Sequence, residues 1–161
     1  MTPALWLTVP LVLVLSACGG SSTGSSSGSG SSTKAAYVQQ AAQVCRDAGA
    51  AKLKAGSSTP SSTAAIAPYV DALVAVAKDA AGKLRALTPP PADQAALASK
   101  LLDPLDVQVT EGEAFAAKVR AAGSDDAKVL GLLGNKPGAG KIDVPFLKAY
   151  GLDDCVQAAQ G

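Results

Sequence analysis

The sequence contains no histidine, and its single methionine and single tryptophan both fall within the first six residues. Haem and di-iron sites in helical proteins need histidine or methionine, while zinc catalysis and a Ser-His-Asp triad need histidine. These sites are therefore excluded. A serine–lysine pair stays formally possible, but no serine stands in a recognisable nucleophile setting. We predict that the chain is not an enzyme and that it has no cofactor, catalytic or metal site.

Charged residues are also scarce, at 17% of 161 residues. All thirteen acids and thirteen of the fourteen bases lie in residues 35–161, so this region has no net formal charge. It contains no basic run or stripe. The charge pattern therefore predicts no nucleic-acid partner and only weak attraction to anionic lipid headgroups.

One long apolar run is present, over residues 4–15, and the sequence Leu15-Ser16-Ala17-Cys18 ends it. A secretory apolar region is about 7–15 residues long, whereas a membrane-spanning helix needs about 20. Residues 1–18 closely resemble bacterial lipoprotein signal peptides. The resemblance implies cleavage before Cys18 and a diacylglyceryl group on its thiol. Two or more acyl chains, each contributing about 0.8 kcal/mol per buried CH₂, hold a protein stably on a membrane.

The leader departs from that pattern in one respect, because no Lys or Arg precedes the apolar run. Either the start lies upstream or export tolerates a weakly charged leader. The alternative is a buried first helix with an incidental cysteine, but residues 19–33 are only Gly, Ser and Thr, which favours a disordered tether. We therefore expect a signal peptide at 1–17, a lipidated linker at 18–34 and a domain at 35–161, on the extracytoplasmic face of the cell membrane.

Alanine is abundant in residues 35–161 and apolar residues recur with helical spacing, which predicts an all-α domain. Expected helices span 35–55, a region from Thr63 or Pro68 to about 87, 92–122, a segment after a Ser124 cap, a segment from Asp143 to about Gly151, and a last turn with Cys155. Pro104 should kink or divide the third helix. These helices predict a four-helix-bundle-like domain. Many positions in its seams are alanine, so we expect close packing and no roomy internal pocket.

The three cysteines leave two once Cys18 is lipidated, and two cysteines allow one pairing. An exported domain meets an oxidising compartment, so we expect a disulfide between Cys45 and Cys155. The alternative is two separate buried thiols. A reactive cysteine is not expected, because no Cys-x-x-Cys motif and no activating histidine are present.

Three other motifs have simple structural explanations. The loop 134–142 resembles a phosphate loop, but that motif would need glycine at Asn135 and a hydroxyl residue at Ile142. Asp154 and its neighbour Asp153 are expected to cap a helix or pair with Arg46. A possible weak Ca²⁺ or Mg²⁺ site is an acidic stripe on the third helix, but one helix face offers too few ligands, so a solvated face is the better interpretation. The stripe consists of Asp103, Asp106, Thr110 and Glu113.

The pattern as a whole resembles a small bacterial envelope lipoprotein, which implies a location more than an activity. The expected function is a non-catalytic interaction or structural module with an envelope-protein or cell-wall partner, which an exposed leucine patch near 130–133 would contact. The alternative is a carrier of a small apolar ligand or lipid held between helices, which needs a cavity of at least about 300 Å³. A third hypothesis is an enzyme that uses only Asp, Glu and Lys.

Replacement Cys18→Ser tests the anchor. Without the thiol no lipid can be attached, so we expect the variant protein to fractionate away from membranes. Membrane fractionation and intact mass measure this. A variant that still fractionates with vesicles and keeps its leader would show that the placement is wrong.

Overall fold

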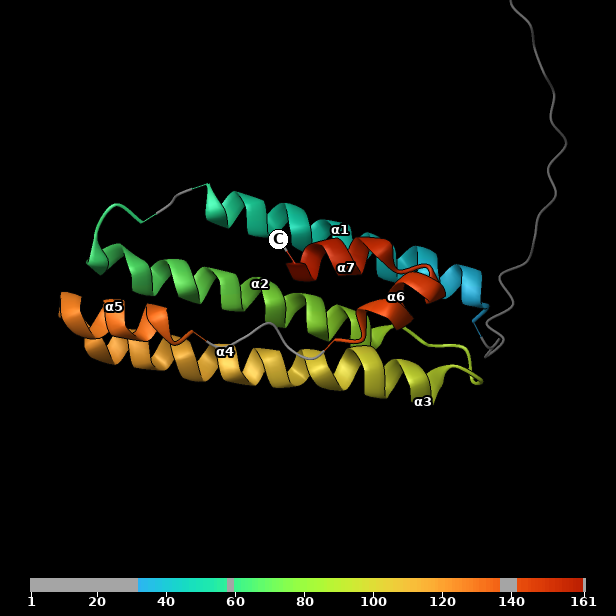
Figure 1. Ribbon diagram of the computed structural model, residues 1–161. Coiled ribbons are helices and arrows are strands. Elements are labelled where there is room, and N and C mark those ends of the chain that lie inside the picture. The colour runs from blue at the N-terminus through green and yellow to red at the C-terminus, as the bar shows by residue number, and fades with distance from the viewer. Residues whose placement is uncertain (1–31, 58–59, 137–141, 161) are drawn as a thin grey trace, which may run out of the picture.

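The computed structural model describes residues 32–57, 60–136 and 142–160, and all regular structure in these ranges is helical (Figure 1). The elements are α1 (Lys34–Gly56), the 3₁₀ helix η1 (Thr63–Ala65), α2 (Ile66–Ala86), α3 (Gln94–Leu97), the π-helical turn η2 (Ala98–Leu102), α4 (Asp103–Ala122), α5 (Asp126–Gly134), α6 (Val144–Tyr150) and α7 (Asp153–Gln160). The prediction of a single all-α domain is confirmed. Within the described ranges, no helix is both long enough and apolar enough to cross a membrane.

Side-chain caps fix several helix starts. The Thr33 hydroxyl accepts the Ala36 N–H at 3.2 Å, and the Asp143 carboxylate accepts the Phe146 N–H at 2.9 Å, as the expected Asp143 cap requires. The expected Ser124 cap is wrong. Asp125 caps α5 by accepting the Lys128 N–H at 3.1 Å. Ser124 lies instead inside a turn that follows Ala122, so it precedes the cap position.

Pro104 shapes the long helix without ending it. Proline lacks an N–H, and its ring clashes with the carbonyl four residues earlier, which here belongs to Lys100. The chain widens into the π-helical turn η2 just before Pro104 and stays helical through α4. The Lys100 carbonyl accepts the Asp143 N–H at 3.3 Å, and the Lys100 ammonium lies 3.4 Å from the Asp143 carboxylate. Through these two contacts, the π-helical turn η2 holds the start of α6 in place.

Helix α2 is central, because it packs against both α1 and α4, while α1 and α4 are not packed against each other within the described residues. The α2–α4 contact is close: a Cβ atom at Gly112 would lie 3.3 Å from Val74 Cγ2. The fourth side of the bundle is not a single helix. Helix α7 packs on α1, α6 packs on α7, and α5 packs on the other end of α4 (Figure 1). Short helices therefore cover the two ends of the molecule.

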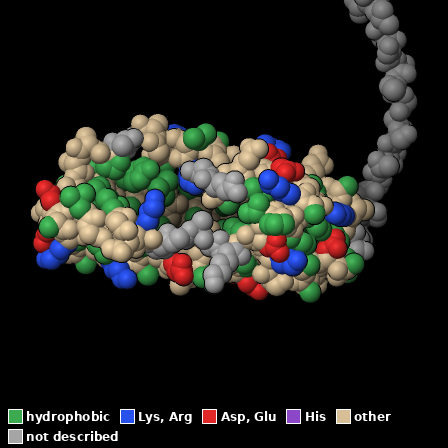
Figure 2. Space-filling view, in the orientation of Figure 1, with side chains coloured by type: hydrophobic (Ala, Val, Ile, Leu, Met, Phe, Trp, Pro, Cys, Tyr) green, Lys and Arg blue, Asp and Glu red, His purple; other side chains and the backbone are tan. Residues whose placement is uncertain are grey.

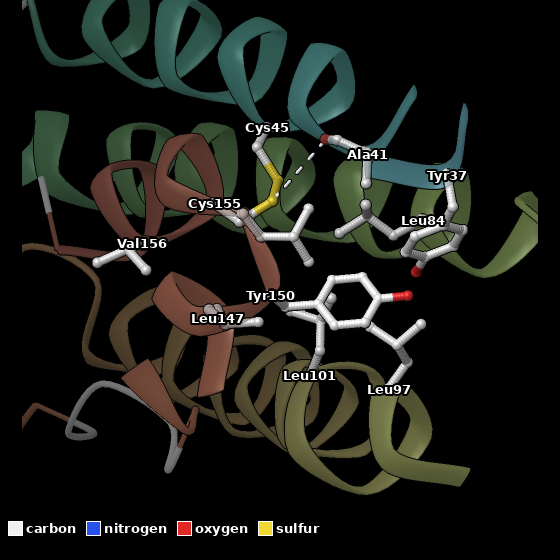
Figure 3. Packing of buried hydrophobic residues seen from close by; sticks show 11 residues of the cluster. Tyr37, Ala41, Cys45, Leu84, Leu97, Leu101, Leu147, Tyr150, Cys155 and Val156 are labelled. Carbon is white, nitrogen blue, oxygen red and sulfur yellow. Dashed lines mark hydrogen bonds between the residues drawn. A yellow bond between two sulfur atoms is a disulfide. The ribbon is translucent and has the colours of Figure 1, made fainter. Parts of the chain in front are cut away.

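The main core lies where α6 and α7 meet the first half of α1 (Figure 3). The rings of Tyr37 and Tyr150 pack edge to face at 6.3 Å, and the predicted Cys45–Cys155 disulfide is present, with 110 residues of sequence separation. The buried members of this core are Tyr37, Ala41, Cys45, Leu84, Leu97, Leu101, Leu147, Tyr150, Leu152, Cys155 and Val156. Ala116, Val119 and Val129 are buried apart from this cluster, on α4 and α5. The apolar interior is thus concentrated toward the covered ends.

Reduction tests the contribution of the disulfide. A cross-link that closes a loop of this length typically stabilises a small domain by about 2–5 kcal/mol. We expect reductant to lower the free energy of unfolding by an amount in this range, measured by urea denaturation with circular dichroism. The Cys45→Ala/Cys155→Ala variant is the matched control and should not respond to reductant. An unchanged midpoint in the natural protein, with both thiols shown to be reduced by mass, would contradict this prediction.

Candidate functional site

An apolar groove runs between the two covered ends of the bundle. It encloses about 480 Å³, with a floor on α2 and walls on α1 and α4. Figure 2 shows hydrophobic side chains gathered around a hollow on this face of the molecule, with basic side chains beside it. Residues that line the groove include Ala48, Leu73, Ala77, Ala80, Leu105, Val109, Gly112, Phe115, Leu133, Ile142 and Ala158.

The expectation that alanine seams leave no roomy pocket is wrong. Small side chains let two helices approach when they face each other directly, as α2 and α4 do at Gly112. Helices α1 and α4 instead lie on either side of α2 and leave a trough between them. The side chains of Ala77 and Ala80 fill little of that trough, so small residues that would allow close packing elsewhere leave space here.

The predicted seam residues are divided between core and groove. At the end covered by α6 and α7, Leu84, Leu97 and Leu101 are buried. In the middle of the bundle, Leu73 and Val109 are only half-buried and line the groove. Sequence periodicity identified this apolar face correctly but gave no signal of where a fourth helix would cover it.

A second hollow, of about 820 Å³, adjoins the groove between α1 and α7. It shares five lining residues with the groove, Lys52 and Leu73 among them, but its lining also includes the Arg46–Asp154 ion pair, whose Nη1 and Oδ2 atoms are 2.5 Å apart. The groove, with its more uniformly apolar lining, is the better candidate site.

No protein-family model matches the sequence, and no curated protein or solved structure matches it. The functional argument therefore rests on the geometry of the groove.

The acidic stripe is used for ion pairs and a local hydrogen bond. Arg85 pairs with Asp103 and Asp106, Lys78 Nζ lies 2.7 Å from Glu113 Oε1, and the Thr110 hydroxyl donates to the Asp106 carbonyl at 2.9 Å. In the described ranges, no group of three or more cysteine and acidic side chains could hold a metal ion. The pairing of the stripe with cations of α2 agrees with its interpretation as a solvated face.

The expected leucine patch is smaller than predicted. Leu130 is 63% exposed, but Leu132 and Leu133 are half-buried, and Leu133 lines the groove. Among the described residues, the other large apolar side chains that are exposed are Leu53 on α1 and Val107 on α4. Helix α5 therefore contributes to the wall of the groove and leaves one leucine exposed. Cys18, the linker up to residue 31 and residues 137–141 of the glycine-rich loop lie outside the described residues.

A tyrosine pair stands at the α6 end of the core. The Tyr150 hydroxyl donates to Asp93 Oδ2 at 2.7 Å, and the Lys34 ammonium lies 4.2 Å from the centre of the Tyr150 ring. The buried Tyr37 hydroxyl has no hydrogen-bond partner among the described residues. Burial raises the pKa of both phenols, and the Asp93 carboxylate raises that of Tyr150 further.

These shifts predict a loss of stability at alkaline pH. A pKa that is raised in the folded state means that folding favours the neutral phenol. The stabilisation that the two phenols contribute is therefore complete below the unfolded pKa of about 10, and it is lost as pH rises through the folded pKa values. We expect tyrosinate absorbance at 295 nm to rise at higher pH in the folded protein than in urea. Tyr150→Phe should reduce the difference in pH between the absorbance curves of the folded and the urea-unfolded protein. Tyr69→Phe, which changes a tyrosine outside the pair, is the control. Coincident curves in water and urea would contradict the prediction.

Proposed function

We propose that this chain is a lipid-anchored, exported binding protein of the bacterial envelope, and that its helical domain holds an apolar ligand in the groove. The observation that carries the proposal is the cavity of about 480 Å³ with its largely aliphatic lining. Small-molecule sites in proteins are typically concave and apolar, with volumes of about 300–1,000 Å³. The groove has the size and the surface chemistry of such a site.

The energetics favour an elongated ligand. The groove follows α2 from Tyr69 to Leu84, and on the opposite side it runs from Leu101 in η2 to Phe115 in α4. Half-buried side chains such as Leu73 and Val109 would lose their remaining contact with water when a ligand covers them. Each CH₂ group transferred from water into such a groove contributes about 0.8 kcal/mol. An acyl chain fits this geometry better than a compact polar molecule does.

The proposed anchor places the groove close to a source of such ligands. Lipid on Cys18 would hold the domain at a membrane surface through the short linker that ends where α1 begins. A carrier function is favoured over an interaction module that works through exposed leucines, because Leu130 is the one exposed leucine in the patch expected near residues 130–133. Both hypotheses assume the same membrane anchor through Cys18.

Filling the groove tests the proposal. Ala77 lines the groove, whereas Ala75 is exposed on the same helix and does not line it. In the mature chain carrying Cys18→Ser, we expect Ala77→Phe to weaken binding of the apolar fluorophore N-phenyl-1-naphthylamine by about tenfold. The phenyl ring would occupy part of the groove and remove apolar contact between protein and fluorophore that corresponds to several CH₂ groups. Ala75→Phe should bind as the parent does. Fluorescence titration measures both, with no background from tryptophan, since Trp6 belongs to the signal peptide.

Thermal unfolding by circular dichroism separates blockage of the groove from loss of the fold. Equal binding by the parent and a folded Ala77→Phe variant would show that the fluorophore does not occupy the groove. Absence of binding by the parent, together with no co-purifying ligand in native mass spectrometry, would overturn the proposed function.

A further inference from the structure

The charged residues of the groove are all of one sign. Among the described lining residues, the charged side chains are Lys52 and Lys136, and none is acidic. Lys52 belongs to α1, whereas Lys136 follows α5, which packs on α4. The two lysines therefore belong to opposite walls, with the apolar floor of α2 between them. Tyr69 and Gln108 add polar groups to the same lining.

Lys52 is half-buried beside this apolar surface. Its ammonium donates to the Ala158 carbonyl over a long 3.5 Å contact, and no carboxylate of the described residues pairs with it. Several other cations of the bundle, such as Lys78 and Arg85, are paired with acids. An anionic group in the groove would give the Lys52 ammonium an oppositely charged hydrogen-bond partner. The charge of the lining is thus complementary to one particular ligand class.

We propose that the groove binds an anionic amphiphile, with its acyl chain on the apolar floor and its carboxylate or phosphate group between Lys52 and Lys136. This inference rests on the proposed function and adds the chemical class of the ligand. The deep end of the groove, near Leu84 and Leu101, contains no charged lining residue and receives the end of the chain. A fatty acid and a phosphate-bearing lipid share this chemistry, and the experiment distinguishes them.

Displacement of N-phenyl-1-naphthylamine by matched twelve-carbon ligands tests the inference in the mature chain carrying Cys18→Ser. Dodecanoate, dodecyl phosphate and 1-dodecanol share a chain and differ in their head groups. We expect the preferred anion to displace the fluorophore at a concentration at least about fivefold lower than dodecanol, because a hydrogen bond to a charged group is stronger than one to a neutral group. The ranking of dodecanoate against dodecyl phosphate tells a fatty acid from a phosphate-bearing lipid. Acetate and inorganic phosphate, which lack a chain, should not displace the fluorophore.

Charge-neutral variants assign the effect to the two lysines. Lys52→Gln/Lys136→Gln should reduce the preference for the anion over dodecanol to about one, with dodecanol binding unchanged, because the variants remove charge and leave the apolar floor intact. Lys54→Gln/Lys118→Gln is the matched control, since both residues are exposed lysines of α1 and α4 that do not line the groove. In the parent protein, added salt should reduce the preference for the anion over dodecanol, because salt screens charges at the open groove.

The outcomes separate the two proposals. If dodecanol displaces the fluorophore as well as both anions do, or if the Lys52→Gln/Lys136→Gln variant keeps the preference, the head-group assignment is wrong while the apolar groove stands. If none of the three ligands displaces a fluorophore that Ala77→Phe excludes, the acyl-chain ligand class is wrong. If the fluorophore does not bind in the groove at all, the proposed function itself fails.

Discussion

The structure depends on the packing of its C-terminal helices against the first half of α1. Helices α6 and α7 are seven and eight residues long, and isolated helices of this length are not stable in water. Burial of Leu147, Leu152 and Val156 holds them in place, together with the link between Cys45 and Cys155. Because these helices cover only one end of the trough between α1 and α4, the same packing that completes the core also sets where the groove begins.

Much of the fold could be predicted from local sequence signals. Apolar spacing gave α1, α2 and the helix that ends at Ala122, and the expected Asp143 cap gave the start of α6. Cysteine counting gave the disulfide, because the expected lipidation of Cys18 would leave a single pairing. The exact cap of α5 was missed because Ser124 and Asp125 are both good capping residues, and only the turn after Ala122 decides between them.

The groove could not be predicted in the same way. Leu73 and Leu84 share one apolar face of α2 and both line the groove, yet Leu73 is half-buried while Leu84 is buried in the core at the deep end. The difference depends on which short helix reaches each of them, which is a matter of tertiary contact and not of local pattern. The proposed role of Lys52 could not be predicted for the same reason, since a lysine near the end of an alanine-rich helix is usually a solvated residue. Its position becomes informative only when the Ala158 carbonyl and the aliphatic floor are seen beside it.

The long separation between Cys45 and Cys155 has a consequence for how the protein is made. A ribosome releases α1 first and α7 last, and domains start to fold from the N-terminal side during synthesis. Cys45 therefore emerges more than a hundred residues before its partner, and Ala158, which lines the groove, emerges later still. The nascent chain can thus bring α1, α2 and α4 together before α7 is available, so the lining of the groove is completed only after these three helices have been made.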